Sequence, residues 1–197
     1  LYYHSQSRDF IMNLFILHED PIIAAQMQCD KHVVKMIVES AQMLSTAHRV
    51  LDGTIENAPS KSGKTIQKHY RLLEDPEMDQ ILYKAVHRGH PCTIWTMESS
   101  SNYEWHWKHF DALCEEYTYR YGKTHATSHL KYPLWSLPTN IPKGKMTPFK
   151  LAMKSNPECM VGDPVKSYRL FYQTKQSRFK MNWSKREQPR WFKNEIY

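Results

Sequence analysis

Glycine, cysteine and long apolar runs are all scarce in this sequence. Only 6 glycines occur in 197 residues, which excludes a collagen-like or low-complexity chain. The 4 cysteines stand alone, without a CxxC pair, so we expect small buried side chains in a reducing compartment rather than disulfides or a zinc knuckle. No apolar run approaches the roughly 20 residues of a membrane span, and the polar residues 1–11 do not resemble a signal peptide. We therefore expect no membrane association.

The motifs of several enzyme classes are missing as well. The sequence contains no GxSxG, no HExxH and no GxxxxGK motif, so it predicts no serine hydrolase, zinc protease or P-loop protein. Its 11 histidines are dispersed. The pairs Cys29 with His32 and His87 with His90 lack the further ligands that a metal site needs. We expect no metal site and no cofactor.

Length and composition predict one folded domain. Hydrophobic residues make up 41% of the chain and charged residues 24%, which is typical of a globular protein. At this length a domain buries roughly 70% of its extended surface and needs no metal or disulfide to hold a core. Met12 begins a stretch typical of a natural protein start, so we expect residues 1–11 to be a tag or extension and 12–197 a single domain.

Caps and breakers predict a mainly helical fold. A polar loop is expected at 53–64, a long proline-containing loop at 123–148, and a short strand at 13–17. Helices are expected from Pro21 and over about 30–51, 65–88 with a break near 75–76, 93–121 and 165–179. The predicted fold class is all-α: a single compact helical domain with a long proline-containing loop and a basic, aromatic C-terminal tail.

The positive charge is concentrated near the C-terminus. The net charge is +7, yet residues 166–193 alone hold nine Lys or Arg against one acidic residue, Glu187. Seven aromatic residues are interleaved with these cations. Cations beside rings that stack on bases predict a nucleic-acid surface, whereas the alternative is a tail docked by its rings with its cations solvated. The residues predicted to contact nucleic acid are Arg49, Arg169, Arg178, Lys185, Arg186, Arg190 and Trp191.

A narrow polar line runs along the helix expected from Asp30. Residues three and four apart share a helix face, and apolar positions flank this line of His32, Lys35, Glu39, Gln42, Thr46 and Arg49. Such a line indicates a largely buried helix whose polar strip faces a cleft or a polar network. Glu39 is therefore the candidate for acid–base work, with Lys35 and His32 beside it. The alternative is a buried Lys35–Glu39 ion pair with His32 as a hydrogen-bonded core histidine.

Asp30-Lys31-His32, followed seven residues after the histidine by Glu39, forms one motif on this helix. It resembles the helix that carries the catalytic glutamate in the pyrimidine-dimer DNA glycosylases of the phage endonuclease V type. Pro189-Arg190-Trp191-Phe192 is similar to the C-terminal Pro-x-Trp-aromatic segment of the same family. The helix expected after Gly89-His90 also looks like that family's middle helix.

The resemblance implies an all-α fold and the excision of damaged pyrimidines from duplex DNA. Enzymes of that family attack the sugar C1′ with an N-terminal amine and pass through an imine, while the glutamate supports the charged intermediate and the later elimination. Glu39 occupies the position of that glutamate, and the family's neighbouring arginines fall on Val38 and Gln42. Lys35, one turn from Glu39, is our own candidate to replace the amine. The target nucleotide has to flip out of the duplex, at a cost of about a few kcal/mol.

The sequence thus predicts a DNA glycosylase and AP lyase as the leading function. Two alternatives stay open: a non-catalytic helical module that binds nucleic acid or an acidic partner, and an enzyme acting on a small anionic metabolite. The strings HPCTIW, NYEW and LCEEYTYRYGK look like those of uncharacterised phage-encoded proteins. That likeness implies the cytoplasm of a bacterial host as the location.

Overall fold

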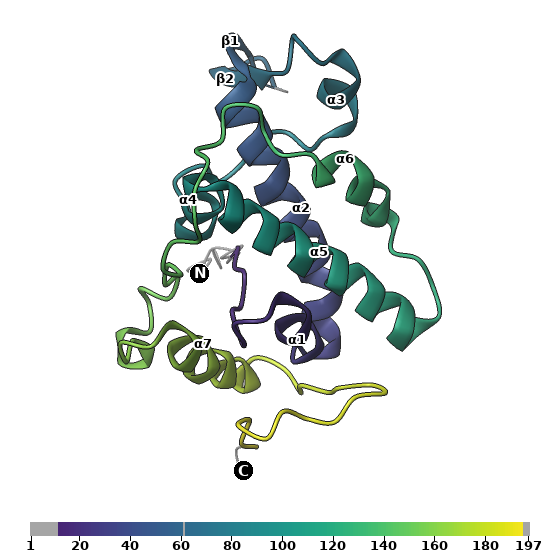
Figure 1. Ribbon diagram of the computed structural model, residues 1–197, viewed down its shortest axis with the longest axis vertical. Helices are drawn as coiled ribbons and strands as arrows, with labels where there is room; N and C mark the ends of the chain where they lie inside the picture. The colour runs from purple at the N-terminus through teal and green to yellow at the C-terminus, as the bar shows by residue number, and fades with distance from the viewer. Residues whose placement is uncertain (1–11, 61, 195–197) are drawn as a thin grey trace, which may run out of the picture.

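Two long helices cross at the centre of the molecule. The computed structural model describes residues 12–60 and 62–194, and within them α2 (Asp30–Asp52) packs against α5 (Ser100–Tyr121). Figure 1 shows the crossing, and α4 (Pro91–Glu98) contacts both helices. The hydrophobic core lies around this crossing, because all three helices turn their buried residues toward it.

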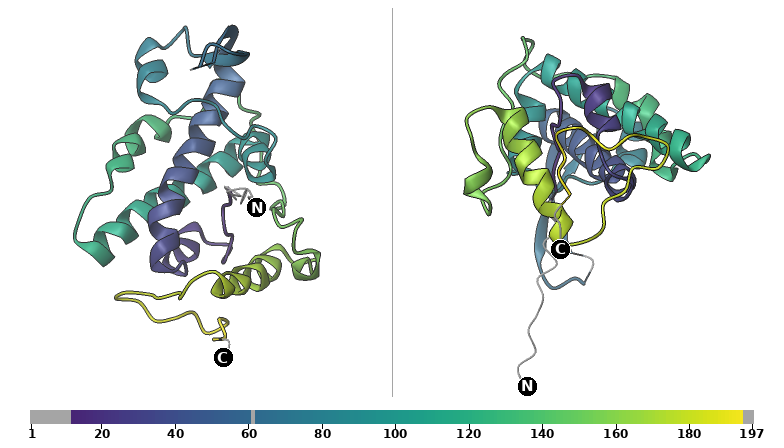
Figure 2. Two further views of the ribbon diagram at one scale, coloured as in Figure 1. Left: turned by 180° about the vertical axis from the view of Figure 1, so that it is seen from behind. Right: turned by 90° about the horizontal axis from the view of Figure 1, so that it is seen from below.

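In Figure 1 the N-terminal segment starts near the middle of the molecule and runs down to α1, whereas the C-terminal segment lies at the lower end. Residues 12–17 are buried throughout and lead into α1 (Pro21–Gln26), which packs on α5. At the same end η2 (Pro157–Cys159), a 3₁₀ helix, precedes α7 (Pro164–Gln173), and a further 3₁₀ helix, η3 (Thr174–Ser177), follows it. The C-terminal segment then passes below α7 and α1 (Figure 2).

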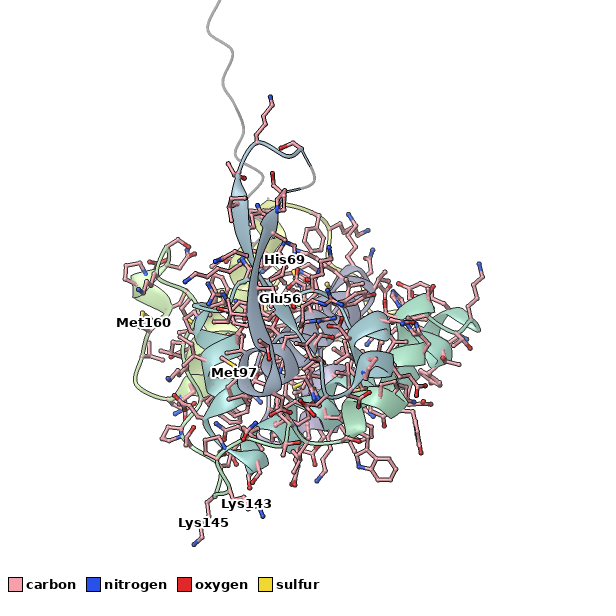
Figure 3. All side chains as sticks on the ribbon, turned by 90° about the horizontal axis from the view of Figure 1, so that it is seen from above. Glu56, His69, Met97, Lys143, Lys145 and Met160 are labelled. Carbon is pink, nitrogen blue, oxygen red and sulfur yellow. The ribbon has the colours of Figure 1, made fainter. Side chains whose placement is uncertain are left out.

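A two-stranded antiparallel hairpin stands at the opposite end. β1 (Thr54–Pro59) pairs with β2 (Ile66–Arg71), with Thr54 opposite Arg71 and Pro59 opposite Ile66. In the turn, Gly63 has a φ of 70°, a left-handed conformation that glycine adopts without a Cβ clash. The helix α3 (Pro76–Ile81) follows the hairpin. In Figure 3 the hairpin projects beyond the helices.

The predicted mainly helical fold is confirmed, but this hairpin means that the protein is not strictly all-α. The sequence predicts a polar loop over 53–64 and a helix over 65–88, where the structure has the two strands, the short α3 and an extended stretch. Most side chains of both strands are exposed, so the sequence lacks the alternation of buried and exposed residues that predicts a strand. A tertiary contact holds β2 instead, since Arg49 of α2 donates to the carbonyl of Tyr70.

The single helix predicted over 93–121 is divided at Ser99 into α4 and α5. The Ser99 backbone is extended, and its Oγ accepts from the N–H of Asn102 at 3.1 Å, which caps the start of α5. The N–H of Ser100 donates to the carbonyl of Pro142, so a distant segment satisfies a donor that the break frees. At the far end of α5, Gly122 terminates the helix with a φ of 65°, as the sequence predicts.

Residues 13–17 do not form the predicted strand. The side-chain Oδ1 of Asn13 accepts from the N–H groups of Leu14 and Phe15 at 2.7 and 3.1 Å, so these donors are not available to a neighbouring strand. Phe15 also has a φ of 45°, which lies outside the β region.

Several other predictions are confirmed. α1 starts at Pro21, α2 runs from Asp30 to Asp52, and α7 starts at Pro164. The proline-containing region 123–148 is mostly irregular, but it holds η1 (Ala126–Leu130), a 3₁₀ helix, and α6 (Lys131–Trp135).

Three further sequence predictions concern the cysteines, membrane-spanning helices and residues 1–11. All four cysteines are buried and free. In the described ranges no helix is both long and apolar enough to cross a membrane. The predicted tag or extension, residues 1–11, lies outside the described residues.

A buried histidine couples stability to pH. His48 is 4% exposed, and its Nε2 lies 2.9 Å from the hydroxyl of Tyr103. Burial lowers the pKa of His48 to about 4, whereas an unfolded histidine has a pKa of about 6.5. The unfolded chain therefore binds a proton that the folded protein excludes, so stability is present above about pH 6.5 and lost as the pH falls toward 4.

We therefore expect His48→Gln to remove about 2 kcal/mol of the stability loss between about pH 6.5 and pH 5, because glutamine does not titrate. Urea unfolding at both pH values measures this difference. His129→Gln, at an exposed position, is the control and should follow the unsubstituted protein. Identical pH dependence in the two variants would contradict the assignment to His48.

Candidate functional site

A pocket of about 370 Å³ opens beside the polar line of α2. Its apolar wall consists of Met12, Val34, Val38 and Val86. Its polar groups are Lys35, Glu39, Gln42, His87 and His125. The N-terminal segment, α2, the stretch before α4 and the start of η1 thus converge on it. The size, and an apolar lining with a few polar groups, are typical of small-ligand sites.

Glu39 lies in the wall of this pocket with both carboxylate oxygens engaged. Oε2 accepts from the backbone N–H of Asn13 at 3.0 Å, and Oε1 lies 3.1 Å from Nζ of Lys35. Burial raises the pKa of the Glu39 carboxyl, while Lys35 and the N–H of Asn13 oppose that rise. The raised pKa makes this carboxylate a stronger base than one in water, which suits proton transfer near neutral pH.

Lys35 is the accessible member of the pair. Its side chain is 48% exposed, against 9% for Glu39, so a ligand in the pocket can reach the amine. The two residues lie four apart on α2, which places them on one face of the helix. The ion pair that the sequence offered as an alternative is therefore present, and it lines a pocket rather than being sealed in the core.

His32 belongs to the core rather than to the pocket. Its Nδ1 lies 2.8 Å from the hydroxyl of Tyr172, which also accepts from the backbone N–H of Cys29 at 2.8 Å. Burial, followed by repulsion from Lys35 and Lys175, lowers the pKa of His32 to about 3. The structure places His32 where it holds α7 against α2, and it does not line the pocket.

A buried amine with a lowered pKa lies on η3. Lys175 is 5% exposed, and its Nζ lies 3.5 Å from the centre of the Phe171 ring. Burial, followed by repulsion from Arg178, lowers the pKa of Lys175 to about 8. Lys175 does not line the pocket. The sequence does not distinguish this lysine from the other cations of the tail, because only the tertiary fold buries it.

Arg49, a predicted nucleic-acid contact, makes its hydrogen bonds to other groups of the protein. It is 4% exposed, and its guanidinium donates to the carbonyls of Tyr83, Tyr70, Asp79 and Leu82 and to the Asp79 carboxylate. These five bonds use all five donors of a guanidinium. Arg49 therefore has none left for a phosphate, and it ties α2 to β2 and α3.

Two predicted cations of the tail are likewise engaged by protein groups. Arg186 donates through Nε and Nη2 to the two carboxylate oxygens of Glu116, each at 2.9 Å. Arg169 donates through Nε to the carbonyl of Leu17 at 2.9 Å, and its guanidinium lies 5.4 Å from the ring centre of Trp191. The first contact fastens the tail to α5, and the second fastens α7 to the N-terminal segment.

The remaining predicted cations are more open to solvent. Lys185 is exposed, although its Nζ donates to the carbonyl of Tyr119 at 3.0 Å. The side chains of Arg178 and Arg190 are exposed and make no hydrogen bond or ion pair within the described residues. None of the cations of 166–193 lines the pocket. The structure therefore does not bring the predicted phosphate contacts together with Glu39.

The rings of the tail dock it onto the helices. Trp183 and Phe192 are 9% and 5% exposed, and the indole N–H of Trp183 donates to the carbonyl of Met27 at 2.8 Å. The indole N–H of Trp191 points at the sulfur of the same Met27, 3.5 Å away. Buried rings offer no face for a base, so this arrangement favours the docking alternative for the aromatic residues of the tail.

Neither a cluster of metal ligands in the described residues nor a known relative indicates the function of this pocket. Within residues 12–60 and 62–194, no three His, Cys, Asp or Glu side chains come together to hold a metal ion. Comparison of the chain with protein-family models, curated proteins and solved structures finds no match. The chemistry of the pocket itself therefore carries the functional argument.

Proposed function

We propose that this protein is a DNA glycosylase and AP lyase, in which the amine of Lys35 and the carboxylate of Glu39 act on a damaged nucleotide. One observation carries the proposal: an accessible amine lies 3.1 Å from a mostly buried carboxylate in the wall of a pocket. An amine forms covalent intermediates with carbonyl substrates when a neighbouring base removes its proton.

The chemistry assigns a separate task to each group. The neutral amine of Lys35 adds to the C1′ aldehyde of an abasic sugar, and loss of water leaves a protonated imine. Removal of a C2′ proton then expels the 3′ phosphate, which breaks the strand. Glu39 accepts the proton that the amine loses on addition, returns it to the hydroxyl that leaves as water, and then accepts the C2′ proton while the 3′ phosphate departs with the bonding electron pair. Its raised pKa, caused by burial, brings it closer to the pH at which such transfers are efficient.

The sequence resemblance supports the same assignment. Asp30, His32 and Glu39, which resemble the family's glutamate helix, all belong to the single helix α2. Asp30 and His32 anchor that helix, since the Asp30 carboxylate accepts from Arg120 and from Ser184. Glu39 is the member of the motif that lines the pocket.

Borohydride trapping tests the proposal. We expect a covalent adduct between the protein and an abasic duplex, because borohydride reduces the imine to a stable secondary amine. Peptide mapping should place the adduct on Lys35. Lys35→Arg keeps the positive charge but removes the nucleophile, so the adduct should be lost.

Lys31→Arg is the matched control, one turn away on the same helix. Lys31 is exposed and lies over the Phe179 ring rather than in the pocket, so its substitution should leave trapping intact. A chain that begins at Met12 is tested in parallel, because Met12 lines the same pocket and its α-amine would be a second nucleophile. No adduct with either chain would overturn the imine mechanism.

The second candidate function is a non-catalytic nucleic-acid-binding module, which would bind a duplex without forming a trapped adduct. The observation that favours it is a set of exposed cations on the tail: Lys166, Arg178, Lys180, Lys185, Arg190 and Lys193. Salt-sensitive duplex binding without any adduct would support this module. A protein without affinity for any polynucleotide would instead favour an enzyme that uses the pocket for a small anionic metabolite.

A further inference from the structure

A second pocket, of about 420 Å³, lies at the base of the hairpin. Residues 67–71 of β2 line it together with residues 84–86, and Arg49 and Asp79 also contribute to its wall. Its lining therefore holds four cationic side chains and one carboxylate: Arg49, Lys68, Arg71, Lys84 and Asp79. A concave site with this excess of one sign attracts anions.

The cations of this pocket differ in what they already bind. Arg49 and Arg71 neutralise Asp79, with N–O distances of 2.6 Å each. Lys68 and Lys84 are exposed and make no hydrogen bond or ion pair in the described ranges. The Nε2 of His69, on the same wall, also has no hydrogen-bond partner among the described residues. Two cations are thus left over for a ligand, with a histidine beside them.

The hairpin pocket adjoins the Glu39 pocket through a fixed wall. Val86 lines both, and its backbone N–H and carbonyl are both hydrogen-bonded to the hydroxyl of Thr46 on α2, at 3.1 and 3.2 Å. Beyond Val86, Arg88 lies over the Tyr70 ring of β2, with 4.8 Å between its Cζ and the ring centre. The two pockets are therefore neighbours, and the residue that they share is hydrogen-bonded to α2.

We propose that the hairpin pocket binds the phosphates of the nucleic-acid strand whose target nucleotide occupies the Glu39 pocket, with Lys68 and Lys84 as the phosphate contacts. This inference rests on the proposed function for its ligand. The chemistry agrees with it, because a nucleotide in one pocket carries its flanking phosphates into the neighbouring one. It also assigns a role to the hairpin, an element that the sequence does not predict. The principal phosphate contacts then lie at the hairpin and not on the C-terminal tail.

Fluorescence anisotropy with the full chain tests this assignment without requiring catalysis. The probe is a labelled duplex that contains a tetrahydrofuran abasic analogue, which has no aldehyde and cannot form an imine. For Lys68→Gln/Lys84→Gln we expect the Kd to rise on the order of tenfold, and the slope of log K against log salt to shrink by about two, since each lysine contributes about one phosphate contact.

Lys143→Gln/Lys145→Gln is the matched control, because it removes the same charge from two exposed lysines that lie at the lower edge of Figure 3, away from the hairpin residues His69 and Glu56 near its centre. We expect this pair to change the Kd much less. Circular dichroism checks that both pairs fold, and neither pair removes a contact within the described residues.

The outcomes separate this inference from the proposed function. Weaker binding by the hairpin pair alone, together with an absent imine adduct, would uphold the phosphate site and overturn the lyase. Equal losses of duplex affinity in the Lys68/Lys84 and Lys143/Lys145 double variants would overturn the phosphate site. The absence of duplex binding by the unsubstituted protein would overturn it as well. A third arm replaces the duplex with inorganic phosphate at matched ionic strength. Phosphate binding without duplex binding would show a free anion site and would also overturn the inference.

Discussion

Glu39→Gln is expected to slow strand cleavage at an abasic site by about 100-fold to 10,000-fold, the range typical for loss of a general base. Glutamine has the shape of glutamate and can still accept from the N–H of Asn13, which bonds Oε2 at 3.0 Å. It cannot take a proton from the amine of Lys35 or from the sugar. Single-turnover cleavage of an abasic duplex, at saturating protein, measures the chemical step directly.

The binding of the duplex distinguishes catalysis from folding in this variant. The substitution removes a negative charge beside Lys35, so affinity for DNA should be unchanged or slightly higher. Glu104→Gln, at an exposed position of α5, should leave the rate unchanged. Unchanged cleavage by Glu39→Gln, or a parallel loss of rate and binding, would contradict a role as the base.

The pH profile of the unsubstituted protein provides a second readout on Glu39. Burial raises the pKa of this carboxyl above its usual range, and a general base acts only in its ionised form. The rate should therefore begin to fall, as the pH is lowered, above the ordinary glutamate value of about 4.3. This acid limb should be absent from the residual activity of Glu39→Gln.

Arg49→Met is expected to lower the free energy of unfolding by about 3–5 kcal/mol, the loss typical when one partner of a buried ion pair is removed. The variant deletes five hydrogen bonds and leaves the carbonyls of Tyr70, Tyr83 and Leu82 without the Arg49 donor. The Asp79 carboxylate loses Arg49 but keeps its bonds from Arg71 and from the N–H of Leu72. Unsatisfied buried groups account for most of the cost. Urea unfolding monitored by tryptophan fluorescence measures it.

Arg178→Met is the control for this substitution, because Arg178 is exposed and without a hydrogen bond or ion pair in the described residues. Its effect on stability should stay within about 0.5 kcal/mol. If Arg49→Met instead kept full stability and bound DNA weakly, the phosphate contact predicted from the sequence would be reinstated.

Acid provides a further check on the Arg49–Asp79 pair. Burial alone would raise the pKa of Asp79, but hydrogen bonds from the N–H of Leu72, from Arg49 and from Arg71 lower it to about 2. The stability that this carboxylate contributes is therefore present above about pH 4 and lost as the pH falls toward about 2. Arg49→Met should lose less of its stability across that range, because one of the lowering groups is gone.

Local signals predicted the central helices well. α2 has an unbroken apolar periodicity from Asp30 and ends before Gly53, and α5 ends at Gly122, so both follow from the chain alone. The break at Ser99 does not, because the segment that satisfies it, around Pro142, lies more than forty residues away. The hairpin was missed for a related reason: its strands are exposed and are held by Arg49 rather than by an alternating core face.

The candidate site was predicted in part. The spacing of Lys35 and Glu39 on one helix face is a property of the sequence, and the structure has their ion pair. The opposite walls of the pocket, Met12, Val86 and His125, come from segments that no periodicity connects to α2. Arg49 and His32 share the polar line with Glu39, yet they turn to the hairpin and to Tyr172.

By itself the sequence determined the two long helices, the polar line on the first of them and the excess of positive charge, because these depend on residues close together in the chain. Tertiary structure alone decided which polar side chains are hydrogen-bonded within the protein and which line a pocket. That choice depends on burial and on hydrogen-bond partners brought from distant segments. The same packing buried the rings of the tail, and it left Lys68 and Lys84 unpaired beside the pocket of Glu39.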